Sequence, residues 1–175
     1  PTPFPTPTSG SNTDTTLPPI SDLTGEILFE EQFDSNQNGW NIGEETDEFG
    51  RYKSEIVDGR YRLSHQAERD VFIWEEPGVP DFYDFVLSVD AIPVEYSAPF
   101  AYGLVFRSGA DQKLYTFGID SDGFFIVNYL ENGKWETLVD STETTGIKTD
   151  GPNRLTVAAL GSTLSFFIKD EEAIT

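Results

Sequence analysis

One stretch of the sequence has residue types and spacing that suit a calcium ion. Asp34, Asn36 and Asn38 alternate, Gly39 follows them, and Glu45 lies six residues further on, which matches the calcium-loop pattern D-x-[DN]-x-[DN]-G-x5-E. Side-chain oxygens at alternate positions converge on one ion, and a backbone carbonyl and the last carboxylate complete its shell. The alternative is an ion-free loop in which these residues serve turn geometry. The candidate calcium ligands are Asp34, Asn36, Asn38, Trp40 and Glu45.

Catalytic chemistry has few residues to draw on. His65 is the one histidine and cysteine is absent, so a histidine relay has a single candidate member and no thiol nucleophile exists. The closest acidic cluster, Glu45-Thr46-Asp47-Glu48, lies in a polar segment without apolar neighbours to favour a protonated acid. We therefore expect no catalytic residues and a protein that is not an enzyme.

A sugar-binding site requires fewer specific residues than a catalytic site. It needs an exposed aromatic ring that stacks on the sugar and polar groups that bond the sugar hydroxyls. Trp135 follows the Asn132-Gly133 turn and so has the best prospect of exposure. Each aromatic residue has an alternative role in the core or at its rim. The candidate ligand-binding residues are Trp135, Trp74, Tyr102, Arg107, Asp120 and Asn128.

The charge balance restricts the partners. The chain has 31 acidic and 11 basic residues, a net charge of −20. Nucleic acid and anionic lipid bind clustered Lys and Arg, so a surface this acidic repels both. No apolar run approaches the ~20 residues of a membrane-spanning helix. We expect no nucleic-acid partner and no membrane insertion.

Residues 1–24 differ in composition from the rest. Alternating Pro and Thr in residues 1–19 favour an extended backbone and leave little to bury, which predicts a linker or tail. Such segments are common spacers in secreted proteins, where their Thr residues can carry sugars. The segment therefore favours an extracellular or cell-surface location.

From residue 25 onward, short aromatic and β-branched runs alternate with turns, and no stretch has helical spacing. Two-residue turns at Asp58-Gly59 and Asn132-Gly133 predict hairpins. Alternation in 82–91 predicts one buried face, and apolar residues on both faces of 124–130 predict a central strand. The pattern predicts an all-β fold over 25–175, an antiparallel two-sheet jelly-roll sandwich. The predicted strands are 27–33, 52–57, 60–64, 71–74, 82–91, 100–107, 114–119, 124–130, 135–139, 154–160 and 163–168.

A series of short motifs runs in order through residues 26–170. They include Phe33-Asp34, Asn38-Gly39-Trp40, Gly59-Arg60-Tyr61-Arg62-Leu63, Tyr102-Gly103-Leu104-Val105-Phe106-Arg107 and Asn153-Arg154-Leu155-Thr156-Val157. The series resembles the concanavalin A-like lectin and glucanase jelly roll. The most similar branch holds 3-keto-disaccharide-hydrolase-like domains and non-catalytic sugar-binding modules of secreted bacterial proteins. The resemblance implies the fold, but that fold hosts lectins, hydrolases and structural modules alike. The glucanase carboxylate motif, E-x-D-x-x-E or E-x-D-x-E, is absent here.

Domains of this type continue after the strand at 163–168 with further strands that close the sandwich. Here the chain reads Lys169-Asp170-Glu171-Glu172 and stops at Thr175, one or two residues into the next strand. The expected explanations are truncation, cleavage that leaves the remainder as a separate chain, or a strand supplied by a neighbouring copy.

These observations lead to two expectations about function. The first is a non-catalytic, surface-displayed module that binds a glycan or a matrix polymer, with calcium as a candidate cofactor. The second is a structural subunit of an extracellular filament or matrix. In that case copies of the chain would meet through the N-terminal tail and the open C-terminal sheet edge.

Overall fold

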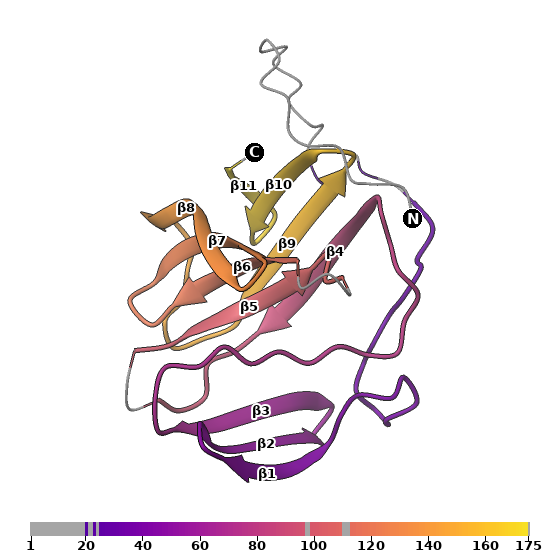
Figure 1. The fold of residues 1–175 in the computed structure, drawn as a ribbon. Coiled ribbons are helices and arrows are strands. Elements are labelled where there is room, and N and C mark those ends of the chain that lie inside the picture. Colours follow the sequence, from indigo (N-terminus) through magenta and orange to yellow (C-terminus); the bar gives the residue numbers. More distant parts are fainter. Residues whose placement is uncertain (1–19, 21–22, 24, 97–98, 110–112, 175) are drawn as a thin grey trace. The chain divides into compact units, whose positions relative to one another are not determined.

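The computed structural model describes residues 20, 23, 25–96, 99–109 and 113–174. The predicted Pro/Thr-rich tail of residues 1–24 therefore lies outside the described residues, apart from residues 20 and 23. The described chain is all-β, with eleven antiparallel strands in three sheets (Figure 1). Within this part of the chain, no helix is long and apolar enough to cross a membrane.

The chain divides into two compact units. One unit, Gly25–Asp81, is here called the hairpin unit, and the other, which contains the described residues from Phe82 onward, the sandwich unit. The expectation of two sheets over residues 25–175 is corrected to three, because the strands of the hairpin unit form a sheet of their own. The expectation of a single domain over this range stays a prediction.

The hairpin unit contains β1 (Gly43–Asp47), β2 (Gly50–Val57) and β3 (Arg60–Ala67), in the order β1-β2-β3. The predicted Asp58-Gly59 hairpin is confirmed, because Val57 pairs with Arg60 and the two turn residues have φ of 51° and 65°. Two consecutive positive φ values are what a type I′ turn requires. β1 was not predicted, since its five residues are all exposed and lack an apolar alternation.

Two predicted strands of the hairpin unit are wrong. Residues 27–33 and 71–74 are rich in strand-forming residues but belong to no sheet. Phe33 has a φ of 57°, and its backbone N–H donates to the Glu31 carboxylate rather than to a neighbouring strand. Strand propensity describes how a side chain fits a sheet surface, and it forms no strand without a ladder partner.

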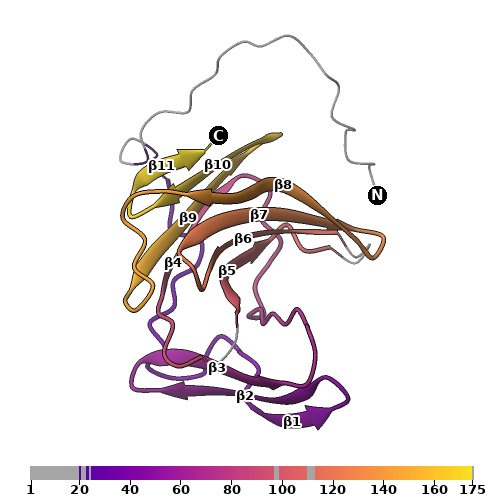
Figure 2. The ribbon, with the colours of Figure 1, turned by 90° about the vertical axis from the view of Figure 1, so that its left-hand side faces the viewer.

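The sandwich unit holds the other eight strands in two four-stranded antiparallel sheets (Figures 1 and 2). One sheet has the order β5-β6-β7-β8 and the other β11-β10-β9-β4. Nine of the eleven predicted strands are therefore confirmed, two of them in the hairpin unit. The strands are β4 (Phe85–Ala91), β5 (Ala101–Phe106), β6 (Leu114–Asp120), β7 (Phe124–Glu131), β8 (Lys134–Glu143), β9 (Asn153–Leu160), β10 (Thr163–Ile168) and β11 (Glu171–Ile174).

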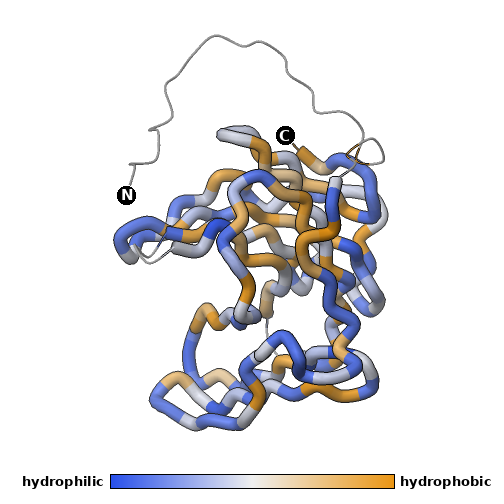
Figure 3. Tube along the Cα trace, turned by 90° about the vertical axis from the view of Figure 1, so that its right-hand side faces the viewer, coloured by the Kyte–Doolittle hydropathy of each residue, from blue (hydrophilic) through white to orange (hydrophobic). Residues whose placement is uncertain are grey.

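The hydrophobic core lies between these two sheets. Phe117 and Phe125 contribute from one sheet, Leu155 and Phe166 from the other, and all four are at most 4% exposed. Figure 3 shows hydrophobic stretches concentrated in the strands of this unit. Burying large aromatic and aliphatic side chains between two sheets is the main favourable contribution to a sandwich. The strands that line this core carry many apolar residues at alternate positions, and for this reason the sequence predicts them well.

Three finer expectations can be compared with the strands. The buried face of β4 is confirmed, since Phe85, Leu87 and Val89 pack against the core while Val86 is 46% exposed. β7 is confirmed as a central strand, between β6 and β8. Residues 171–174, expected as the start of an incomplete strand, form β11, which pairs with β10 at the edge of its sheet.

Candidate functional site

The β7–β8 hairpin carries two of the six predicted ligand-binding residues. Its turn consists of Asn132 and Gly133, with φ of 52° and 73°, so the chain reverses in two residues and places Glu131 opposite Lys134. The next pair in the ladder is Trp135 with Leu130, and Trp135 is 48% exposed. The predicted exposure of Trp135 after this turn is confirmed.

A depression with a volume of about 390 Å³ lies at this hairpin. This volume falls within the range of small-ligand sites in proteins. Tyr129 pairs with Glu136 and Trp135 with Leu130, so these two lining residues belong to opposite faces of the sheet, and the depression lies at the end of the hairpin. The lining residues are Tyr129, Glu131, Asn132, Lys134, Trp135 and Glu136.

Contacts on β6 and β7 hold Tyr129 and Glu131 in place. The Tyr129 ring lies 4.6 Å from the Tyr115 ring, centroid to centroid. Burial, followed by the negative charge of Glu131, raises the pKa of Tyr129, so its hydroxyl stays protonated at neutral pH and can donate a hydrogen bond. Lys113 forms an ion pair of 2.8 Å with Glu131.

Asn128 lies on the same sheet face as Trp135. Asn128 pairs with Thr137 and Leu130 with Trp135, so these two cross-strand pairs follow one another on one face. The Asn128 side-chain oxygen accepts a hydrogen bond of 3.0 Å from the Thr137 hydroxyl. The sheet therefore offers an amide and a hydroxyl one row away from the exposed indole.

The other four predicted ligand-binding residues lie elsewhere. Tyr102 packs against the core, and its hydroxyl accepts a hydrogen bond of 2.8 Å from Asn153. Arg107 donates to the carbonyl oxygen of Gly161 at 2.7 Å. Asp120 accepts from the backbone N–H groups of its own turn, and Trp74 belongs to the hairpin unit, where it is 43% exposed. Of the six, Trp135 and Asn128 belong to the same hairpin.

The predicted calcium loop is organised by a carboxylate that the pattern did not include. Glu31 accepts hydrogen bonds from the Phe33 backbone N–H at 2.6 Å, the Asn38 amide at 2.8 Å and the Trp40 indole at 3.0 Å. The Asn38 hydrogen bond is the main cause of a lowered pKa for Glu31, against the opposing effect of burial. The Trp40 ring also lies 5.0 Å from the Tyr61 ring, which attaches the loop to β3.

The candidate calcium ligands are distributed around this arrangement. The Asn36 amide donates 2.9 Å to the Trp40 carbonyl oxygen, which the pattern assigned to the ion. Asp34 is exposed in the same loop, whereas Glu45 lies on β1 and accepts a hydrogen bond from the Tyr52 hydroxyl. Across the described residues, no group of three or more His, Cys, Asp or Glu side chains is placed to hold a metal. Calcium binding, which would rely on amides as well, stays a prediction.

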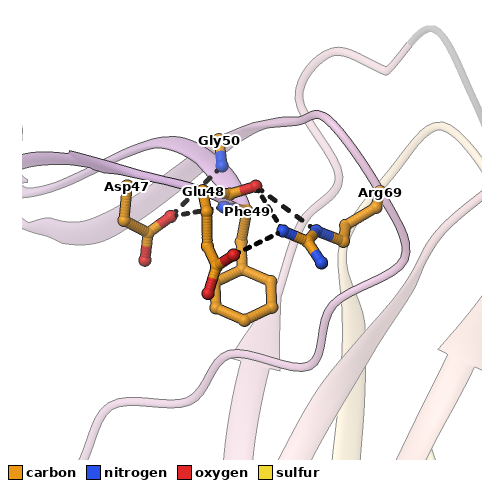
Figure 4. A network of polar contacts seen from close by, with 5 residues as sticks. All are labelled: Asp47, Glu48, Phe49, Gly50 and Arg69. Carbon is orange, nitrogen blue, oxygen red and sulfur yellow. Dashed lines mark hydrogen bonds and ion pairs between the residues drawn. The ribbon is translucent and has the colours of Figure 1, made fainter.

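The acidic cluster at the β1–β2 turn has a structural role (Figure 4). The Asp47 carboxylate accepts from the backbone N–H groups of Phe49 at 2.7 Å and Gly50 at 3.2 Å. The Arg69 guanidinium pairs with the Glu48 carboxylate at 2.9 Å and lies 4.6 Å from the centre of the Phe49 ring. The carboxylates of Asp47 and Glu48 therefore stabilise a tight turn.

Sequence reasoning missed most of the lining of the depression. Trp135 was singled out, but Tyr129, Glu131 and Glu136 were not. The Asn132-Gly133 turn implied the cross-strand pairing of Tyr129 with Glu136, so the signal was present in the turn spacing. Comparison with protein-family models, with curated proteins and with solved structures finds no match to this chain.

Proposed function

We propose that this chain is a non-catalytic, extracellular β-sandwich module of the jelly-roll kind that binds a glycan at the β7–β8 depression. The single observation that carries the proposal is the exposed Trp135, 48% accessible, which lines a depression of about 390 Å³. Sugars present an apolar face that stacks on aromatic rings, and hydroxyls that need donors and acceptors beside those rings.

The polar lining supports a sugar more than a charged small molecule. Glu131 and Glu136 offer oxygens that accept hydrogen bonds from hydroxyls, and Asn132 and Lys134 offer donors. The lining holds two carboxylates and one ammonium group, and Lys113, which lies outside the lining, forms an ion pair with Glu131. These four charges sum to zero, which favours a neutral ligand with many hydroxyls.

The proposed absence of catalysis rests on the same carboxylates. Glycoside hydrolysis requires two carboxyl groups across the scissile bond, one of which holds a proton to donate. Glu131 is held in an ion pair of 2.8 Å with Lys113. Glu136 is exposed to solvent and is not enclosed in an apolar pocket of the kind that holds the proton-donating carboxyl of a glycosidase.

The test is a glycan array followed by calorimetric titration of the wild-type protein and Trp135→Ala. We expect the substitution to weaken binding at least tenfold, since ring stacking and the buried area of an indole are lost. Trp74→Ala is the matched control, because Trp74 is exposed to a similar extent, 43% against 48%. Unchanged binding by Trp135→Ala, with a loss for Trp74→Ala, would move the site to the hairpin unit.

The same material tests the two remaining expectations. Repeating the titration and the thermal melt with EDTA and with added calcium tests the loop of Asp34, Asn36 and Asn38. Sedimentation velocity tests assembly into a filament or matrix through tails and sheet edges. A monomer at all concentrations would contradict the structural-subunit alternative and leave the glycan-binding proposal in place.

A further inference from the structure

One face of the hairpin unit concentrates basic side chains in this otherwise acidic chain. Strand residues alternate between two faces, so Arg51 and Lys53 of β2 share a side. On β3, Arg62 pairs with Glu55 and Arg60 with Val57, which places both arginines on that same side. Four of the 11 basic residues of the chain therefore lie on one face, here called the basic face.

The opposite face of the sheet is covered in part. Ser54 is 3% exposed and its neighbours Tyr52, Ile56 and Tyr61 are half-buried, whereas Leu63 on that side is 39% exposed. On the basic face, by contrast, the side chains of Arg51, Lys53 and Arg62 are 58%, 46% and 48% exposed. Arg60 is exposed as well. The four cationic groups are therefore available to a ligand.

Two carboxylates on the same face position these cations without cancelling them. Glu44 of β1 pairs with Arg51, and Glu55 pairs with Lys53 at 2.6 Å and Arg62 at 3.9 Å. Arg60 has no ion-pair partner among the described residues. Four positive and two negative side chains leave the strands of this face with an excess of two positive charges, whereas the chain as a whole has a net charge of −20.

We propose that the basic face binds an anionic polysaccharide, a polymer that carries carboxylate or sulfate groups along its length. Cations two residues apart on a strand are about 6.8 Å apart, so they form a row that an extended polymer can follow. A guanidinium group matches a carboxylate or sulfate with two parallel hydrogen bonds. Thr46, Ser64 and Gln66 lie on the same face and add groups that can bond sugar hydroxyls.

The net charge of the chain decides the conditions of the test. At 0.15 M ionic strength the Debye length is about 8 Å, so a ligand on the basic face experiences mainly the nearby cations. At 0.01 M the length is about 30 Å, and repulsion from the whole acidic chain would oppose binding. The proposed function enters this proposal at one point, the choice of a polysaccharide as the ligand. The basic face and the depression belong to different units, so each can be tested without the other.

The experiment compares dextran sulfate, polygalacturonate and uncharged dextran as probes at 0.15 M salt, by calorimetry or affinity electrophoresis. We expect the wild-type protein to bind both charged polymers and not dextran. The double variant Arg60→Glu with Arg62→Glu should bind them at least tenfold more weakly, because exposed cations become repulsive. The control Lys148→Glu with Lys169→Glu changes the net charge equally in the sandwich unit and should bind as the wild type does.

Several results would overturn the proposal. One is a lack of binding to both charged polymers, and another is equal weakening by the control variant. Double-stranded DNA that binds as tightly as dextran sulfate would replace the polysaccharide with nucleic acid. Concentration-dependent dimers lost in the Arg60/Arg62 variant would identify a second copy of the chain as the occupant.

Two further measurements keep these results interpretable. Should the glutamate variant fail to fold by circular dichroism, Arg60→Gln with Arg62→Gln replaces it and should still weaken binding. Trp135→Ala should bind the charged polymers normally, so a failure of the glycan site in the depression and a failure of the basic face are distinguished.

Discussion

The side-chain amide of Asn153 on β9 donates a hydrogen bond of 2.8 Å to the hydroxyl of Tyr102 on β5, which links the two sheets of the sandwich. Asn153 is fully buried. Its amide also donates to the carbonyl oxygen of Lys148 at 2.7 Å, and its side-chain oxygen accepts from the Lys148 backbone N–H at 2.8 Å. One side chain therefore closes the loop before β9 and fixes it to the other sheet.

We expect Asn153→Ala to lower the free energy of unfolding by about 3 kcal/mol, because it removes all the hydrogen bonds that this fully buried side chain makes to Tyr102 and to the loop before β9. Tyr102→Phe removes only the inter-sheet hydrogen bond and should cost about 1 kcal/mol. Urea denaturation of both variants measures the difference. Equal losses would show that the loop contacts of Asn153 contribute nothing beyond the bond to Tyr102.

A second prediction concerns two glycines that pair across β5 and β6. Gly103 lies opposite Gly118. A Cβ atom on Gly103 would overlap the carbonyl oxygen of Phe117 and lie 2.6 Å from the Cα of Gly118, whereas one on Gly118 would lie 3.0 Å from the carbonyl oxygen of Tyr102. The first clash is with backbone atoms, which cannot move without separating the strands.

Gly103→Ala should therefore lower the free energy of unfolding by about 3 kcal/mol, and Gly118→Ala by about 1 kcal/mol. Thermal unfolding monitored by circular dichroism gives the order of the two variants. A reversed order would mean that the close approach of the strands at Gly103 is absent in solution.

A third prediction concerns Glu31 and pH. Glu31→Gln replaces a carboxylate that accepts three hydrogen bonds, and it should cost about 1 to 2 kcal/mol at pH 7. The folded state lowers the pKa of Glu31 from its ordinary value of 4.5. The stabilisation is therefore present above pH 4.5 and is lost as the pH falls through the folded-state pKa.

The difference between the wild type and Glu31→Gln should accordingly shrink on acidification, in denaturation curves recorded at pH 7 and below pH 4. Glu30→Gln is the neighbouring control, because Glu30 accepts only one exposed hydrogen bond, from Gln32. A difference that is independent of pH would assign the effect to packing of the loop instead of to the charge of Glu31.

Local signals predicted much of the fold. The Asp58-Gly59 and Asn132-Gly133 turns set the register of two hairpins, because only a few residue types tolerate two positive φ values in succession. The apolar alternation of β4 and the central position of β7 were also readable. Residues 27–33 and 71–74 had the same propensity but formed no strand, since a strand depends on a partner that local composition does not specify.

The candidate sites show the same division. The exposure of Trp135 was predicted from the turn before it. The presence of Tyr129 in the lining of the depression follows from the pairing of β7 with β8. The acidic composition predicted the absence of a basic patch, yet alternation on two paired strands gathers Arg51, Lys53, Arg60 and Arg62 on one face. Net charge averages over the whole chain, whereas a ligand within a Debye length responds to the local arrangement.

The sequence by itself determined the all-β class, the hairpin turns and the apolar residues that can form a core, because these depend on backbone preferences and on local periodicity. Only the tertiary structure decided which strands share a sheet, that Glu31 organises the predicted calcium loop, and which side chains meet at the depression beside Trp135. Sheet membership depends on contacts between residues far apart along the chain, which no local pattern encodes. The Glu31 hydrogen bonds and the depression each lie within one short segment, but they depend on how the side chains of that segment are placed in the fold.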